Sequence, residues 1–161
     1  MAPPLFALLT VAWLALVVSA PLLPVPVGAA LYVVGSFICH QRPERSFHLF
    51  SAQLPVCARC AGIYAGAAIG FSMAWMSPRA HARVLRSSPR TLLLVGAVPT
   101  MLTLLLEWSH LWAGSNVVRG LAGLPLGLSS AFVVVQAAAT LHYDECAPQR
   151  PIENNQASTP T

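Results

Sequence analysis

The chain has 161 residues, of which 56% are hydrophobic and only 9% are charged. Soluble domains carry about 25% charged residues, so this composition indicates a protein embedded in a lipid bilayer rather than one with a water-facing surface. The formal net charge is +4, and the arginines that produce it lie in short segments between apolar runs. Nucleic-acid binding needs a continuous basic face, so we expect membrane lipids, and no nucleic acid, as partners.

The first apolar run, residues 5–20, is predicted to be a membrane-spanning helix. A cleaved signal peptide is the alternative, because Val18-Ser19-Ala20 resembles a cleavage site. However, the residues before the run carry no basic side chain, and Pro21 would follow the cut, where proline is poorly tolerated. We therefore expect this helix to be retained.

A second apolar run, residues 27–38, follows a proline-rich segment that ends the first helix. A membrane span needs about 20 residues, so this run is too short to cross a bilayer. It is predicted to be an interfacial or re-entrant helix. The polar segment 39–56 comes directly after it.

Three longer apolar runs complete the membrane part, with a basic loop over residues 77–90 after the first of them. The runs are predicted as spans at 57–76, 91–106 and 117–141. The expected fold is an all-α integral membrane bundle of about four transmembrane helices plus the short interfacial helix. Residues 1–146 would form one membrane domain, followed by a disordered polar tail over 147–161.

Glycines repeat every fourth residue in the predicted 57–76 helix, at Gly62, Gly66 and Gly70. Small residues at this spacing let another helix approach closely. The pattern favours tight helix packing, and it permits a homo-oligomer through the same face.

The arginine distribution predicts the orientation of the bundle. The 77–90 loop carries four arginines and no acidic residue, whereas the opposite side interleaves Glu44 and Glu107 with its arginines. By the positive-inside rule we expect a multi-pass protein of the inner (plasma) membrane, with this loop and both termini in the cytoplasm. The cysteine-rich segment would then lie at the outer face.

Cys57 and Cys60 form a CxxC motif at the start of a predicted helix. A helix N-terminus favours a thiolate, because it offers unsatisfied amide donors and a positive dipole end, and Arg59 adds a nearby charge. The CxxC motif serves both metal binding and thiol–disulfide exchange, so it leaves these two chemistries open.

Cys39 and His40 extend the motif to the Cys₃His ligand set of a closed tetrahedral zinc site. Adjacent residues point in different directions on a helix, so His48 is the alternative to His40 as the nitrogen ligand. Packing as small buried hydrophobes is the other interpretation of these cysteines. For Cys146, which is predicted to lie across the membrane, that interpretation is preferred.

A second polar group is expected at the same face as the cysteines. Glu107 and His110 share one helix face, as do Asn116 and Arg119, because each pair is three residues apart. Ionisable residues near membrane depth usually pair, so Glu107 and Arg119 are predicted to form an ion pair. That pair is either purely structural or part of a pocket beside the cysteines. The candidate lining residues are Arg42, Arg45, Tyr64, Glu107, His110, Asn116 and Arg119.

Three functions are compatible with these residues. The first is a membrane protein that binds a metal ion, with zinc the first candidate, through Cys39, His40, Cys57 and Cys60. The second is a thiol–disulfide oxidoreductase with Cys57 and Cys60 as the redox pair and Cys39 forming a mixed disulfide, possibly coupled to a quinone cofactor. The third is a lipid-handling or structural scaffold whose arginines meet headgroups.

The segments CHQRPERSF and PVCARCAGIYAG, at residues 39–47 and 55–66, are distinctive. Together with Asn116-x-x-Arg119 they resemble a prokaryotic membrane protein family called domain of unknown function 2085, over roughly residues 20–130. The resemblance implies a multi-span membrane protein with a Cys/His cluster, and it implies no activity.

Overall fold

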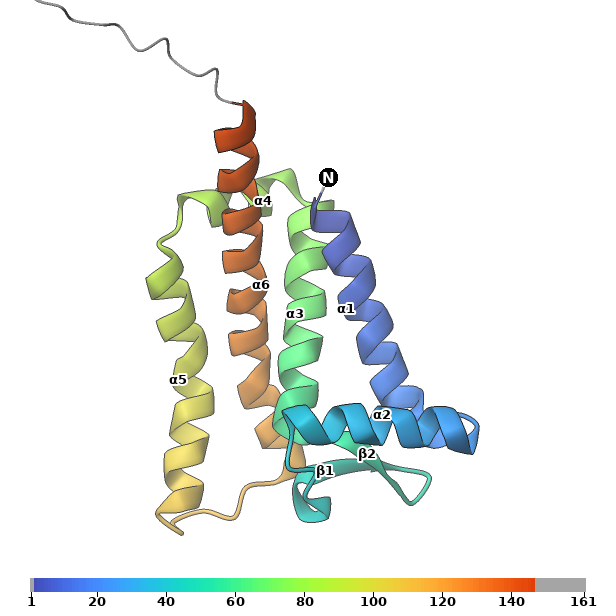
Figure 1. The fold of residues 1–161 in the computed structure, drawn as a ribbon. Helices are drawn as coiled ribbons and strands as arrows, with labels where there is room; N and C mark the ends of the chain where they lie inside the picture. The colour runs from blue at the N-terminus through green and yellow to red at the C-terminus, as the bar shows by residue number, and fades with distance from the viewer. Residues whose placement is uncertain (1, 147–161) are drawn as a thin grey trace, which may run out of the picture.

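The computed structural model describes residues 2–146 and consists mainly of four long helices that run side by side (Figure 1). These helices are α1 (Ala2–Ser19), α3 (Ala58–Met76), α5 (Pro89–Trp108) and α6 (Asn116–Cys146). They lie close to the four runs expected from the sequence, and the all-α membrane bundle is confirmed. The tail predicted over 147–161 lies outside the described residues.

Three helices of the described part are long and apolar enough to cross a membrane. They cover Pro4–Leu22, Pro89–Trp108 and Asn116–Leu141. Helix α3 has a comparable length but is not one of them, because it is rich in glycine and alanine. It packs against both α1 and α6, and eight of its residues are buried, so it needs few large apolar side chains facing lipid. We expect α3 to cross the membrane as well, because it packs side by side with α1 and α6, which both include candidate spans.

Helices α3 and α6 meet along a seam of glycines. A Cβ atom added at Gly62 would lie 1.9 Å from the carbonyl oxygen of Gly120, and one added at Gly127 would lie 1.9 Å from that of Ile63. Gly66 meets the backbone of α6 in the same way. The tight helix packing predicted from the glycine spacing is therefore made inside the chain. A homo-oligomer through the face of Gly62, Gly66 and Gly70 would have to displace α6.

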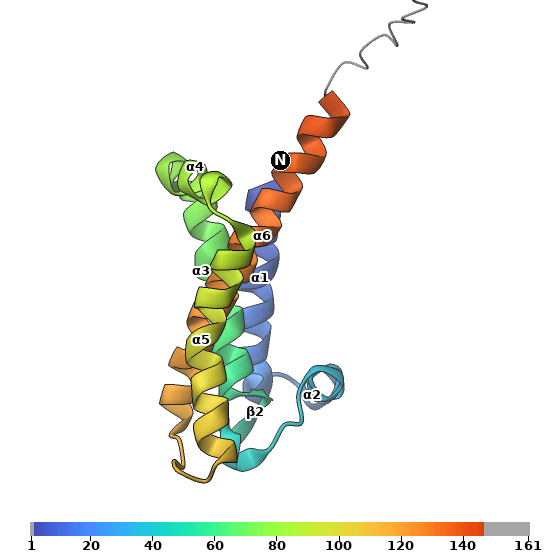
Figure 2. The ribbon, with the colours of Figure 1, turned by 90° about the vertical axis from the view of Figure 1, so that its left-hand side faces the viewer.

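Helix α2 (Val25–Ile38) crosses one end of the bundle, nearly perpendicular to α1, and is seen almost end-on in Figure 2. A short 3-10 turn, η1 (Ala20–Leu22), makes the corner between α1 and α2. Gly35 allows α2 to approach the following strand, since a Cβ there would lie 2.3 Å from the carbonyl oxygen of Pro55. The short helix predicted at 27–38 is thus present and lies across the end of the long helices.

The polar segment after α2 folds into a β-hairpin, which the sequence analysis did not predict. A 3-10 turn η2 (Pro43–Arg45) leads into antiparallel strands β1 (Ser46–Leu49) and β2 (Ala52–Cys57). The two turn residues, Phe50 and Ser51, both have positive φ, of 51° and 66°. Hairpin turns of this kind are usually marked by Asn-Gly or Asp-Gly, and Phe-Ser gives no such signal.

The basic segment predicted as a loop over 77–90 contains a short helix, α4 (Pro78–Arg86). The hydroxyl of Ser77 accepts a hydrogen bond from the Ala80 amide at 3.3 Å and caps its N-terminus. At its other end, the side-chain amide of Gln136 on α6 donates to the carbonyl oxygens of Val84 and Ser87. The loop prediction was wrong here because these contacts, rather than apolar periodicity, hold the helix.

The two ends of the bundle differ in content. The start of α1, helix α4 and the last turns of α6 lie together at one end (Figure 1). Helix α2 and the hairpin lie at the other end, where β2 leads directly into α3. The cysteine-rich segment and the basic helix are therefore at opposite ends of the molecule.

Candidate metal centre and its arginine-lined cavity

Three cysteines converge where α2, β2 and α3 meet. Cys39 is the C-terminal cap of α2, Cys57 is the last residue of β2, and Cys60 lies in the first turn of α3. Their Sγ atoms all lie within 4.8 Å of one another, and all three are free thiols. Cys39 is buried, and the other two are half-buried. The convergence brings residues from three separate elements to one point.

Backbone and amide contacts hold Cys39 against the CxxC motif. The backbone N–H of Cys57 donates to the sulfur of Cys39 at 3.2 Å. The side-chain amide of Gln41 donates to the carbonyl oxygens of Tyr32 at 2.7 Å and Pro55 at 2.8 Å. One glutamine therefore ties α2 to β2 beside the cysteines, and the crosswise placement of α2 determines where Cys39 lies.

The Cys57 thiol is prepared to be a thiolate. Its pKa is lowered from 9.0 to about 5, chiefly because the Cys60 thiol donates a hydrogen bond to it. Burial opposes this shift, while the backbone amides of Cys60 and Arg59 and the Cys39 thiol add further donors. These amides belong to the open N-terminus of α3, whose unsatisfied donors favour a negative charge. This shift favours the thiolate, which is the form of cysteine that binds a metal ion.

The two candidate histidines are placed differently from the cysteines. His40 is exposed, and its ring nitrogens are not within 4.8 Å of all three sulfurs. It does line the same cavity as the cysteines. His48 is exposed on β1, opposite Gln53 in the hairpin, and does not line that cavity. The structure thus gathers the three sulfurs predicted as ligands and leaves the nitrogen position open.

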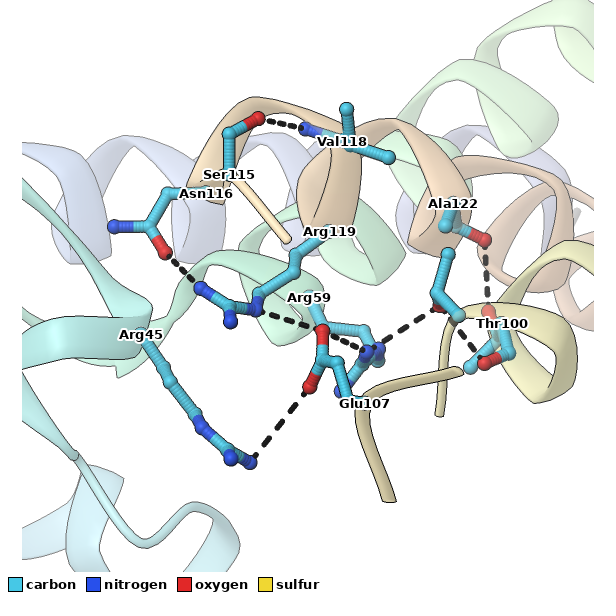
Figure 3. A network of polar contacts seen from close by, with 10 residues as sticks. Arg45, Arg59, Thr100, Glu107, Ser115, Asn116, Val118, Arg119 and Ala122 are labelled. Atoms are coloured by element: carbon cyan, nitrogen blue, oxygen red, sulfur yellow. Dashed lines mark hydrogen bonds and ion pairs between the residues drawn. The ribbon is translucent and has the colours of Figure 1, made fainter. Parts of the chain in front are cut away.

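A buried carboxylate next to the cysteines draws together arginines from three elements (Figure 3). Glu107 Oε1 accepts from Arg119 Nε at 2.8 Å and from Arg59 at 3.3 Å, and Oε2 lies 3.8 Å from Arg45. The Glu107 side chain is only 4% exposed. The predicted ion pair between Glu107 and Arg119 is therefore present, as part of a larger cluster.

Neutral side chains orient these arginines. The Asn116 carbonyl oxygen accepts from Arg119 at 2.8 Å, and its amide donates to the backbone of Ser46 at 2.8 Å (Figure 3 shows the first contact). Thr103 accepts from Arg59 at 3.3 Å. The start of α6, the hairpin and the C-terminal half of α5 are thus all tied to the same cluster.

A cavity of about 660 Å³ lies between the cysteines and the arginine cluster. Its polar lining residues are Cys39, His40, Gln41, Arg42, Arg45, Cys57, Arg59, Cys60, Glu107, His110 and Arg119. Two predicted lining residues lie elsewhere. Tyr64 packs edge-on against Trp13 of α1, with ring centroids 6.0 Å apart, and Asn116 stands behind Arg119. The cavity therefore combines sulfur, carboxylate and guanidinium groups in one space.

Sequence reasoning missed the roles of three residues that build this site. Arg59 was seen as a charge near the thiols, but its ion pair with Glu107 joins segments far apart in the chain. Thr103 carried no recognisable pattern, and Gln41 appeared only as part of the CHQ segment, because their importance comes from contacts to partners elsewhere in the chain. The placement of Arg59 between the two motif cysteines was the one signal available.

A family of predicted membrane proteins, DUF2085, matches this chain over residues 39–133. An uncharacterized protein of Methanothermobacter thermautotrophicus is 34% identical over 95 residues, which is 59% of this chain and 82% of that protein. An uncharacterized protein of Methanocaldococcus jannaschii is 52% identical over 44 residues, covering 27% of this chain and 28% of that protein. No solved structure matches this chain.

The matched region begins at Cys39 and includes all three clustered cysteines, Glu107 and the arginines around it. The resemblance inferred from the CHQ, PERSF and PVCARC segments is confirmed. This chain belongs to the DUF2085 family of predicted membrane proteins.

Proposed function

We propose that this membrane protein binds a soft divalent metal ion, with zinc the first candidate, through the thiolates of Cys39, Cys57 and Cys60. The observation that carries the proposal is the convergence of three free thiols from three elements, with their sulfurs within 4.8 Å of one another. Buried packing cysteines have no reason to gather beside a polar cavity. Soft thiolate ligands suit zinc, copper(I) and iron, and only zinc is free of redox chemistry.

The sulfur positions are compatible with such an ion. A zinc–sulfur distance of about 2.3 Å and tetrahedral angles place ligand sulfurs about 3.8 Å apart. Sulfurs already within 4.8 Å need only a small movement to reach that geometry. Three of the four tetrahedral positions would then be filled by protein.

All three cysteines line the cavity, so the fourth position would be filled from that side. His40 lines that cavity and could supply a nitrogen ligand if the exposed segment after Cys39 moved. Water or an exogenous ligand would fill the position otherwise. An open fourth position is typical of zinc sites that act on or handle a ligand, whereas four protein ligands are typical of structural sites.

Elemental analysis of detergent-purified protein, combined with thiol counting, tests the proposal. We expect stoichiometric zinc in the unaltered chain and loss of that zinc in each of Cys39→Ser, Cys57→Ser and Cys60→Ser, because all three sulfurs are needed. Cys146→Ser is the matched control and should keep its metal. His40→Ala should also keep stoichiometric metal if the fourth ligand is exogenous.

The opposite result is equally clear. A metal-free preparation in which Cys57 and Cys60 form a reversible disulfide would reject metal binding and favour the thiol–disulfide alternative, with or without a quinone. A protein that folds and keeps its metal content with serine at all three positions would leave only the scaffold alternative.

We further propose that the cysteine end of the bundle faces outward and that α4 faces the cytoplasm. The arginines of α4 and its junction, Arg79, Arg83, Arg86 and Arg90, are all exposed at one end, as the positive-inside rule requires of a cytoplasmic side. A membrane-impermeant thiol reagent applied to intact cells should label the metal-stripped cysteine cluster and spare a Ser87→Cys probe in a chain lacking Cys146. Labelling of the Ser87→Cys probe alone would reverse the orientation.

A further inference from the structure

The cavity beside the cysteines contains more positive charge than its single carboxylate can balance. Four arginines line it, Arg42, Arg45, Arg59 and Arg119, against one glutamate. Three thiolates would balance the remaining charge of +3, but a divalent ion bound to them would restore a net charge of +2. A metal-loaded cavity of this kind therefore favours an anionic ligand.

The arginines divide into two kinds. Arg59 and Arg119 are nearly buried, with side chains 13% and 10% exposed, and both are fixed on Glu107. The Nε of Arg59 is buried and has no hydrogen-bond partner among the described residues. Arg45 is 38% exposed and touches Glu107 only at 3.8 Å, and Arg42 is exposed. The guanidinium groups of Arg42 and Arg45 are thus available to bind a ligand, next to the nearly buried charges of Arg59 and Arg119.

We infer that this cavity binds the phosphate group of a phosphomonoester or of free phosphate. Planar guanidinium forks match phosphate oxygens in bidentate pairs, and arginine is favoured over lysine where that geometry matters. A phosphate dianion would balance the net charge of +2 completely. A ligand with a single carboxylate would balance only half of it. Arg45 belongs to η2 and Arg42 precedes it, while Arg59 and Arg119 belong to α3 and α6, so the guanidinium groups that line the cavity come from three parts of the fold.

Exposed apolar side chains beside the cavity are relevant to whether the phosphate belongs to a lipid or is a free ion. Ile38 and Trp108 line the cavity and are 55% and 77% exposed, so apolar surface adjoins the charged space at the end of the bundle. A lipid phosphate could place its chains on that surface, and free phosphate would use the arginines alone. Both sources share one headgroup chemistry.

Equilibrium binding to zinc-loaded protein in neutral detergent tests this inference. The probes are radiolabelled inorganic phosphate and dihexanoyl phosphatidic acid, each with acetate as a competitor. The test variant is Arg42→Gln with Arg45→Gln, and the matched control is Arg83→Gln with Arg86→Gln at the opposite end of the bundle. Loss of two charge-assisted contacts should weaken binding about tenfold or more in the test variant and leave the control unchanged.

Each outcome decides the question. Saturable phosphate binding with this arginine dependence supports the inference and identifies the free ion as sufficient, and the same dependence for phosphatidic acid alone supports a lipid phosphate. No saturable binding of either probe, equal binding by the test variant, or equal displacement by acetate would overturn it.

The charge balance rests on the proposed metal, and measuring zinc and phosphate on the same samples separates the two proposals. Zinc content, measured on the same samples, should be unchanged in the arginine variants. Cys57→Ser should lose zinc and weaken phosphate binding through the lost charge, without removing any arginine. A protein that holds zinc but no phosphate contradicts only this inference, and one that binds phosphate in an arginine-dependent manner but no zinc contradicts only the proposed metal.

Discussion

Both ends of the helix bundle carry arginines, but the two ends use them in opposite ways. At the α4 end, Arg79, Arg83 and Arg86 lie along one exposed face of a short helix. At the cysteine end, Arg45, Arg59 and Arg119 converge on Glu107, whose side chain is almost completely buried. Exposed arginines of this kind contribute to the orientation of the protein in the membrane and to its solvation. Buried arginines need a counter-charge from another part of the chain and therefore constrain the fold. Residue type alone does not distinguish these cases; burial and partners do.

The largest expected effect comes from removing the shared carboxylate. Glu107→Gln should destabilise the protein by about 3–5 kcal/mol, because it leaves Arg59 and Arg119 buried without a counter-charge. Arg86→Gln at the other end should change stability by less than about 0.5 kcal/mol. Denaturant unfolding of both variants in detergent would check the contrast, and similar stabilities would show that the two ends do not differ.

A smaller effect is expected from the seam that joins the two ends. Gly127→Ala would place a methyl group 1.9 Å from the carbonyl oxygen of Ile63, and overpacking of this kind costs about 1–3 kcal/mol. The loss should be global, lowering both metal content and the thermal midpoint. Leu121→Ala, on an exposed position of the same helix, is the control. If Gly127→Ala matched the control, the close approach of α3 and α6 would be refuted.

Gln41→Ala should affect the cysteine end alone. The side chain makes two hydrogen bonds that tie α2 to β2, so its loss should let Cys39 move away from Cys57. Residues that orient metal ligands typically contribute about 10–100-fold in metal affinity. A zinc competition titration measures this loss, with Ser36→Ala on the exposed side of α2 as control. Unchanged affinity would mean that α2 is held by other contacts.

The smallest and most local effect should follow from Gln136→Ala at the α4 end. It removes the two hydrogen bonds from α6 to Val84 and Ser87, worth about 1 kcal/mol each. Helix α4 should then open more readily, and trypsin should cleave after Arg83 and Arg86 faster while zinc content stays constant. Gln53→Ala in the hairpin serves as the control for loss of an amide side chain. A change in metal content instead would show that the two ends are coupled.

Several features of the fold followed from sequence patterns because they depend on local properties. Long apolar runs predicted the helices, since backbone groups in lipid must be satisfied within the segment. Glycines at every fourth position predicted close packing, although their partner, α6, was not identifiable. The hairpin and α4 were missed, because the Phe50-Ser51 turn and the Gln136 contacts give no compositional signal.

In the candidate site, too, local spacing was readable from the sequence and contacts between distant segments were not. The spacing of Cys57 and Cys60 indicated a paired site by itself, because three residues make less than one helical turn. The approach of Cys39 depended on α2 lying across the bundle and on the contact between Gly35 and Pro55. His40 was adjacent to Cys39 in sequence, yet it is exposed outside the sulfur cluster.

The sequence by itself determined that this chain is an apolar helical membrane protein with a CxxC motif at a helix start, because hydropathy and short-range spacing are local properties. Only the tertiary structure decided that Cys39 joins that motif and that three arginines share one buried glutamate. The physical reason is that buried charges and thiols depend on partners distant in the chain. Only the packing of α2, α3, α5 and α6 brings those partners together.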